Sequence, residues 1–191
     1  MDLDGFVIDI RRGDLLIEIQ TGAFAAMGRK LDRLLADHRM LLVHPVAVET
    51  YLRRPGGYSR RSPKRNDLYG LFDELVSLPT MLDHPNLSLE VVLVAVDKIQ
   101  EPDAALRRRR GGWRTVDRCL REIRSRHRFD GPGDLAALVP AGLPATFSTA
   151  DLALAAGTSR VRAQKMAYCL RANELVEPVR RTRQGVLYQC C

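Results

Sequence analysis

Residues 5–22, GFVIDIRRGDLLIEIQTG, decide the fold that we expect for this chain. Two short segments rich in Ile and Leu flank the dipeptide Arg12-Gly13, and this pattern predicts two antiparallel strands joined by a tight turn. A two-residue loop at Arg12-Gly13 sets the register of the strand pair. The expected cross-strand partners are Asp9 with Leu16, Val7 with Glu18, and Gly5 with Gln20.

The alternation of side chains along a strand gives this hairpin one polar and one apolar face. Asp9, Glu18 and Gln20 share the polar face. The apolar face is continuous, so we expect the hairpin to pack on it. Carboxylates within strands are costly to bury unless they are paired or bind a metal, so the polar face needs an explanation of its own. The apolar face comprises Phe6, Ile8, Ile10, Leu15, Ile17 and Ile19.

Two carboxylates and an amide on one face suit metal-assisted hydrolysis of phosphodiesters. Mg²⁺ binds through one or two carboxylates, keeps several waters, and lowers the pKa of a bound water. Asp9 and the triplet Glu18-Ile19-Gln20 resemble the motif of the PD-(D/E)XK nuclease superfamily, with Gln20 where most members have Lys. The Glu-x-Gln variant occurs in some active members. The resemblance implies that Asp9 and Glu18 bind Mg²⁺ or Mn²⁺, and that Gln20 orients water or contacts the phosphate.

The segment after the hairpin extends this resemblance. Phe24, Met27, Leu31, Leu34 and Leu35 recur at helical spacing, and MLLVHPVAV at residues 40–48 predicts a buried strand. Strand–strand–helix–strand is the order of the superfamily core, so we assign residues 1–105 to an α/β (α+β) restriction-endonuclease-like domain. The alternative is an ordinary hairpin unit whose carboxylates are solvated on an exposed face.

Two further points bear on the expected site. Asp4 is the other candidate for the first ligand, and a three-residue loop would reverse the parity of the hairpin and place it on the same face as Glu18. Asp14 is expected to flank the turn as a solvated residue. The superfamily usually has a helix before the first motif strand, often with an acidic residue that assists metal binding. This chain begins almost at that strand, so we expect either a truncated start or a reduced site.

Composition indicates a soluble protein with an anionic partner. Of the 191 residues, 46% are hydrophobic and 28% charged, no apolar run approaches the length of a membrane span, and the first residues do not resemble a signal peptide. The net charge of +7 favours a nucleic-acid partner, although a GC-rich genome would also enrich Arg. We expect a cytoplasmic protein with reduced thiols, because no zinc-ligand or CxxC spacing joins Cys119, Cys169, Cys190 and Cys191.

The middle of the chain contains the basic clusters. The Gly- and Pro-rich residues 53–67 predict a long basic loop, residues 67–79 a short helix and residues 87–99 a strand. Residues 104–114 carry four consecutive arginines and are expected to connect this strand to a basic helix over residues 115–129. We assign residues 106–132 to this connecting helix or linker, ending at the Gly- and Pro-containing boundary FDGPGD.

The pattern of residues 133–191 resembles a winged helix-turn-helix. Residues 135–139 predict a first helix, Ser148 or Thr149 caps a helix over residues 151–156, and residues 157–159 form the turn. The second helix is expected over residues 160–172. The segments LVEPV and GVLYQ predict a β-hairpin around a basic tip. The residues expected to face inward from the second helix are Ala163, Met166, Ala167 and Leu170.

In a winged helix-turn-helix the second helix enters the major groove of DNA and the wing contacts the backbone. The resemblance therefore implies DNA contacts from the exposed side of the helix and from the wing. We expect a metal-dependent DNA endonuclease-like protein, with no membrane partner. The alternatives are a non-catalytic DNA-binding or transcriptional regulatory protein with a degenerate nuclease core, and a winged helix used for protein contact, including a homodimer. The expected DNA-contacting residues are Arg160, Arg162, Gln164, Lys165, Tyr168, Arg180, Arg181 and Arg183.

Overall fold

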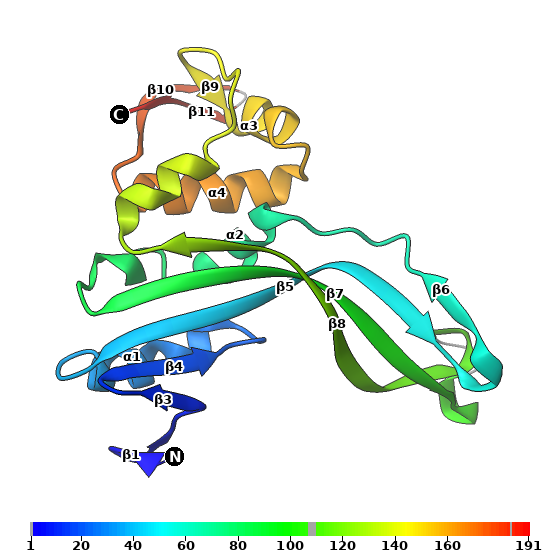
Figure 1. Cartoon of the computed structure of the whole chain (residues 1–191). Coiled ribbons are helices and arrows are strands. Elements are labelled where there is room, and N and C mark those ends of the chain that lie inside the picture. The colour runs from blue at the N-terminus through cyan, green and yellow to red at the C-terminus, as the bar shows by residue number, and fades with distance from the viewer. Residues whose placement is uncertain (1, 107–109, 184) are drawn as a thin grey trace. The chain divides into compact units, whose positions relative to one another are not determined.

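The computed structural model describes residues 2–106, 110–183 and 185–191 of the chain (Figure 1). These residues form an α+β structure that divides into two compact units. The core unit consists of the segment ending at His44, Tyr69–Val91 and His127–Cys191, and the strand unit of Pro45–Leu68 and Val92–Arg126. None of the described helices is both long and apolar enough to cross a membrane.

The hairpin predicted near the N-terminus is present, with its turn shifted by one residue. Strands β3 (Ile10–Arg12) and β4 (Leu15–Ile19) are antiparallel, and Arg12 lies opposite Leu15. The loop is therefore Gly13-Asp14 and not Arg12-Gly13, and Gly13 has a φ of +59° that favours glycine. The register moves by two residues, so the predicted parity of the strand pair is preserved. Before the hairpin, β1 (Asp2–Leu3) and β2 (Phe6–Val7) form a two-stranded sheet.

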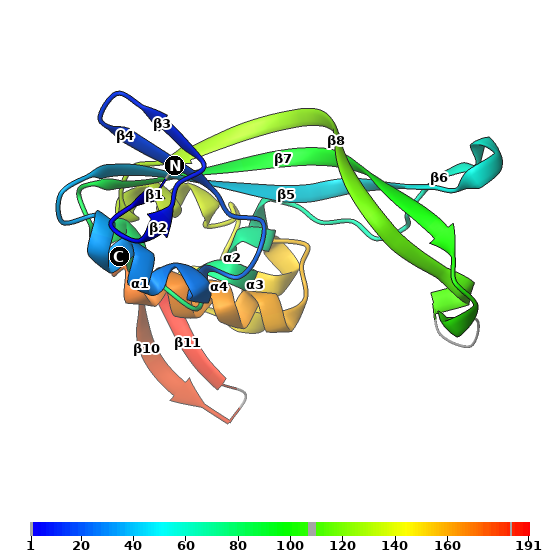
Figure 2. The ribbon, with the colours of Figure 1, turned by 90° about the horizontal axis from the view of Figure 1, so that it is seen from below.

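The prediction that the hairpin packs on its apolar face is wrong. Leu16 is 1% exposed, whereas Ile10 and Ile19 are 47% and 44% exposed. The face that carries Leu16 and Glu18 turns inward, because Lys30 of helix α1 (Gly28–Leu34) binds Glu18 and satisfies its charge. Figure 2 shows α1 beside β1 and β2.

Helix α1 connects two parallel strands. A short 3-10 helix, η1 (Phe24–Met27), leads into α1, and β5 (Arg39–Arg53) then runs parallel to β4, with Leu15 opposite Arg39 and Ile19 opposite Val43. The predicted order of strand, strand, helix and strand is confirmed. The helical spacing is confirmed as well, since the side chains on its apolar face are buried: Phe24, Met27, Leu31, Leu34 and Leu35.

The prediction of a basic helix over residues 115–129 is wrong. These residues belong to strand β8 (Trp113–Phe129), which is an edge strand. The order of strands in its sheet is β3-β4-β5-β7-β8, where β7 spans Leu87–Pro102. The short strand β6 (Ser59–Arg61) pairs with β5. Val116, Leu120 and Ile123 have helical spacing, but pairing with the preceding strand β7 overrides that local signal. Residues 107–109 of the predicted connection lie outside the described residues.

The segment between β6 and β7 contains less helix than predicted. The helix expected over residues 67–79 is reduced to η3 (Leu68–Leu71) and α2 (Phe72–Leu75), followed by η4 (Met81–Asp83). The loop expected over residues 53–67 contains β6 and the short η2 (Pro55–Gly57). Two further 3-10 turns, η5 (Ala104–Leu106) and η6 (Arg110–Gly112), precede β8.

The last segment of the core unit matches its predicted elements closely. It contains η7 (Pro132–Leu138), α3 (Thr149–Ala155) and α4 (Arg160–Ala172), then a sheet ordered β10-β11-β9. Ser148 caps α3, because its hydroxyl accepts from the N–H groups of Ala150 and Asp151. The predicted inward residues of α4 are buried. The three strands are β9 (Phe147–Ser148), β10 (Val176–Thr182) and β11 (Gly185–Cys190).

The observed packing of the N-terminal hairpin makes a direct prediction. Leu16→Ala removes a fully buried side chain and should lower the free energy of unfolding by roughly 2–5 kcal/mol. Ile10→Ala, on the exposed face, should lower it by about 1 kcal/mol or less. Urea unfolding of both variants followed by circular dichroism measures the difference. A larger loss from Ile10→Ala would show that the hairpin packs on the opposite face.

Candidate functional site

The carboxylate of Glu18 is held in a buried ion pair. The Lys30 ammonium lies 2.6 Å from Oε1 of Glu18, and the two side chains are only 11% and 12% exposed. Lys30 also donates to the carbonyl oxygen of Val7 at 2.6 Å, which ties α1 to β2. The second oxygen of Glu18, Oε2, is buried and accepts no hydrogen bond. Glu18 therefore keeps one acceptor available beside a fixed positive charge.

Asp9 lies between β2 and β3 and is exposed. Its Oδ2 accepts a hydrogen bond of 2.8 Å from the N–H of Ile19, the residue after Glu18. In this way the Asp9 carboxylate takes a position that a backbone carbonyl normally occupies in a strand pair. Asp9 is thereby fixed at the carboxyl end of β4.

Gln20 is also bonded within the protein. Its side-chain Nε2 donates to the carbonyl oxygen of Ala23 at 2.9 Å, at the entry to η1. Its own carbonyl oxygen accepts from Nδ1 of His44 at 2.8 Å. His44 is buried in β5, and its ring meets the ring of Phe24 edge-on with centroids 4.9 Å apart. Gln20 therefore fixes the turn between β4 and η1.

The three predicted residues thus gather at the carboxyl end of β4, where β4 and β5 run parallel. Such strand ends are common places for ligand sites in α/β proteins. Sequence reasoning missed Lys30, although its spacing from Met27 and Leu34 places it on the buried face of α1, where an unpaired Lys is rare. Within residues 2–106, 110–183 and 185–191, no group of three or more His, Cys, Asp or Glu side chains could hold a metal ion.

Two residues expected on the exposed side of α4 bind a carboxylate of α2 instead. The guanidinium of Arg162 donates to Oδ2 of Asp73 at 3.1 Å from Nε and at 2.7 Å from Nη2. The ammonium of Lys165 lies 2.9 Å from Oδ1 of the same residue. Arg162 and Lys165 are consequently half-buried, and their placement on the exposed side of the helix is corrected.

The exposed side of α4 is a stripe at helical spacing. Arg160, Gln164 and Tyr168 follow one another at intervals of four residues, and Arg171 continues the stripe. The β10–β11 hairpin presents its arginines in the same module, and all three are exposed: Arg180, Arg181 and Arg183.

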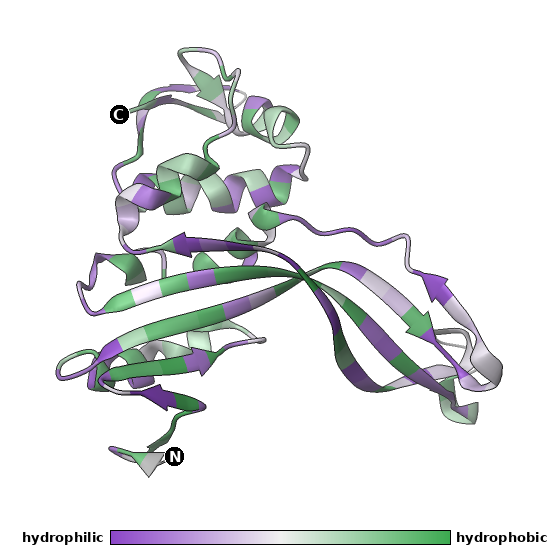
Figure 3. Cartoon of the chain, viewed as in Figure 1, coloured by the Kyte–Doolittle hydropathy of each residue, from purple (hydrophilic) through white to green (hydrophobic). Residues whose placement is uncertain are grey.

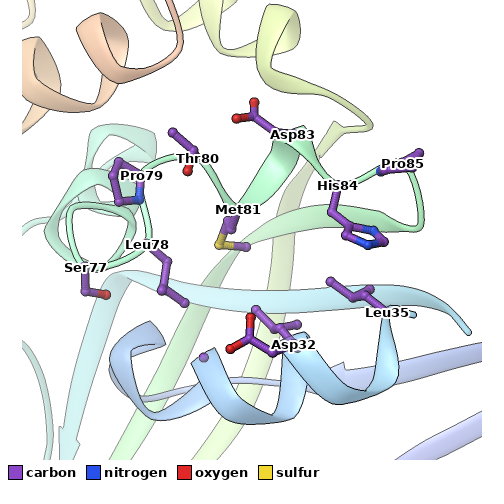
Figure 4. A pocket seen from close by; sticks show the side chains of 12 residues that line it. Asp32, Leu35, Ser77, Leu78, Pro79, Thr80, Met81, Asp83, His84 and Pro85 are labelled. Atoms are coloured by element: carbon purple, nitrogen blue, oxygen red, sulfur yellow. The ribbon is translucent and has the colours of Figure 1, made fainter. Parts of the chain in front are cut away.

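A hollow of about 610 Å³ lies elsewhere in the core unit, between α1 and the segment that contains η4 (Figure 4). Its lining is largely apolar, with Leu78 and Met81 directed toward α1. The carboxylate of Asp83 points away from it, and Nδ1 of His84 accepts from the N–H of Asn86 at 3.2 Å. Asp32 on α1 supplies a carboxylate to the lining. This hollow contains none of the residues predicted from the nuclease or winged-helix motifs.

Residues 1–130 match the family model described as "Domain of unknown function (DUF8091)". The chain belongs to this family. The matched residues include Asp9, Glu18 and Lys30. Helices α3 and α4 lie after residue 130, outside the matched range. The chain is also 31% identical over 195 residues to a protein of Treponema pallidum (strain Nichols) described as "Uncharacterized protein", covering 99% of this chain and 77% of the relative. No solved structure matches the chain.

The contact between α2 and α4 makes a prediction about pH. Partial burial raises the pKa of Asp73, but hydrogen bonds and charges from Arg162 and Lys165 outweigh it, so the pKa lies below its ordinary value of 3.8. A carboxyl with a lowered folded-state pKa stabilises the protein above its unfolded pKa and loses that effect as pH falls through the folded value. Asp73→Asn should therefore cost about 1 kcal/mol near neutral pH and progressively less below about pH 4.

Urea unfolding at neutral and acidic pH measures this cost. Asp83→Asn is the matched control, because Asp83 is an exposed carboxylate in the same segment with no ion pair in the described structure. A cost for Asp73→Asn that does not change with pH would contradict the ion-pair account.

Proposed function

We propose that this protein binds DNA through its C-terminal module, folded as a winged helix. The observation that carries the proposal is the β10–β11 hairpin, whose Arg180, Arg181 and Arg183 are exposed beside α4. The order of η7, α3, α4 and the hairpin, with β9 paired to β11, supports this assignment. Arginine presents a planar fork of donors that suits phosphate oxygens.

In this proposal the exposed stripe of α4 enters the major groove. Arg160 and Gln164 are of the types that read G and A edges, and Tyr168 extends the contact surface. Arg162 and Lys165 have a different role, because both bind Asp73. They position α4 on α2 and do not contact bases.

The proposal predicts how a wing variant behaves. Replacing Arg180, Arg181 and Arg183 with Ala should weaken binding to every DNA sequence, because phosphate contacts do not depend on the base. The slope of log affinity against log salt concentration should become less steep by about 3. Each phosphate that the wing no longer neutralises removes about 0.9 from this slope. Fluorescence anisotropy with a labelled duplex, measured over a series of salt concentrations, gives both quantities.

The matched control removes three exposed arginines from elsewhere in the core unit: Arg12, Arg29 and Arg39, each changed to Ala. This control variant should keep its affinity within about twofold, because its arginines belong to β3, α1 and β5 and not to the winged-helix module. Equal behaviour of the wing and control variants would indicate that the wing faces protein.

A second candidate is metal-dependent cleavage of DNA by a PD-(D/E)XK-like core. The unpartnered Oε2 of Glu18 and its neighbour Asp9 favour it, because hard oxygen ligands suit Mg²⁺ or Mn²⁺. Lys30 brings an ammonium to Glu18, a charge that the motif lacks when Gln20 replaces Lys. We propose that Lys30 supplies this charge from the helix.

Asp9 and Oε2 of Glu18 would hold the metal ion, which supplies a water of lowered pKa when bound. The chain's own residues would prepare the site. Lys30 fixes the position of the Glu18 carboxylate and adds positive charge near a phosphate, while Gln20 holds the turn through Ala23. In the non-catalytic alternative, the Lys30 ammonium takes the place of the metal and the pair is purely structural.

A nuclease assay separates these two possibilities. With Mg²⁺ or Mn²⁺ and supercoiled, linear and single-stranded DNA, a catalytic protein should lose cleavage on the order of 100-fold on Glu18→Ala or Lys30→Met. DNA binding measured without metal and the circular dichroism spectrum should persist in both variants, and a changed spectrum would assign the loss of cleavage to unfolding instead. Asp14→Ala, an exposed carboxylate of the same hairpin, serves as the control and should keep its activity. Absence of cleavage by the wild type, together with no Mn²⁺ binding in calorimetry, would leave the non-catalytic DNA-binding function.

A further inference from the structure

The positive charge of the chain is concentrated in the strand unit. The sequence ranges of this unit contain sixteen Lys and Arg against seven Asp and Glu, a net charge of +9. The ranges of the core unit carry a net charge of −2. The +7 of the whole chain therefore comes from the strand unit, and any anionic partner is attracted there most strongly.

One face of the strand unit has its charges paired. Asp97 of β7 binds Arg53 at 3.1 Å and Arg121 at 3.5 Å. The guanidinium of Arg121 also lies 4.0 Å from the ring centre of Tyr51. Glu49 of β5 contributes a second carboxylate that binds Arg61 of β6 at 3.1 Å. The arginines named on this face are therefore paired with carboxylates of the same unit.

The opposite face is different. Lys98 follows Asp97 in β7, so its side chain points to the other face of the sheet. Burial lowers the pKa of Lys98, and the charges of Arg118 and Lys64 lower it further. In the part of the chain that the structure describes, no ion pair joins these three cations to a carboxylate. We call Lys64, Lys98 and Arg118 the open-face cluster.

The surroundings of this cluster are accessible. Lys98 and Arg118 line a shallow hollow together with Thr115, Val116 and Asp117. The carboxylate of Asp117 accepts from the backbone N–H of Arg118, so it is directed to the main chain. Figure 3 shows hydrophilic colours recurring along β8, which carries Arg118. Because the positive charges of Arg118 and Lys64 repel that of Lys98, an anion that binds beside Lys98 relieves this repulsion.

We propose that the open-face cluster binds backbone phosphates of DNA, so that the strand unit is a second DNA-contacting surface. Lys and Arg side chains that bind phosphates release the counterions condensed on DNA, which favours binding without regard to sequence. The inference rests on the proposed function for the identity of the ligand. It does not depend on the winged helix.

The test uses the full chain with Lys64, Lys98 and Arg118 changed to Ala. Affinity for a labelled duplex should fall about tenfold at physiological salt. The slope of log affinity against log salt concentration should become less steep by about 3. The control variant lacking Arg12, Arg29 and Arg39 removes the same charge from the core unit and should stay within about twofold of the wild type. Lys98→Arg alone keeps the charge and should keep the affinity.

Comparison with the wing variant distinguishes the two surfaces. Loss in the open-face variant alone supports this inference and contradicts the winged-helix proposal, whereas loss in the wing variant alone contradicts this inference. Equal affinities of the open-face and control variants overturn it. So does loss of binding to phosphatidylserine vesicles with DNA binding unchanged, because the cluster would then serve a membrane surface. If the triple variant does not fold, Arg118→Glu at an exposed position replaces it, and unchanged DNA affinity in that variant overturns the inference.

Discussion

The ion pair between Glu18 and Lys30 is the interaction on which the N-terminal half of the core unit depends. It joins β4 to α1 at 2.6 Å, and the same ammonium reaches the carbonyl of Val7 in β2. Two charges are removed from water to make this pair, so loss of either partner leaves the other buried and uncompensated. The pair lies on the same face of the hairpin as the buried side chain of Leu16, so the charge of Glu18 is satisfied on the face that turns inward.

The parts of the fold that could be predicted are those set by neighbours in the sequence. Helix α4, the cap at Ser148 and the parity of the first hairpin all follow from local patterns, and the structure has them. Strand β8 could not be predicted, because its apolar residues have helical spacing and only pairing with β7 makes them a strand. The buried face of the hairpin could not be predicted either, since alternation alone does not show that Lys30 would neutralise Glu18.

The candidate sites differ in how many of their polar and charged side chains are already paired within the protein. At the end of β4 the polar side chains already have partners within the protein, apart from one oxygen of Glu18. On α4, Asp73 takes two of the cations that a motif comparison assigns to DNA. The β10–β11 hairpin and the open-face cluster retain their charges on the surface. The family match includes the strand unit as well as the first hairpin, so both belong to the part shared with the DUF8091 family.

Strand β8 has one further consequence. It is an outer strand of its sheet, seventeen residues long, and exposes the apolar side chains of Val116, Leu120 and Ile123. A long open edge of this kind invites pairing with another chain, and charged side chains are a common safeguard against it. The arginines of β8 are charged side chains of this kind, so they oppose edge-to-edge pairing of two copies. Substitutions that remove charge from β8 would therefore also lower the barrier to self-association along this edge.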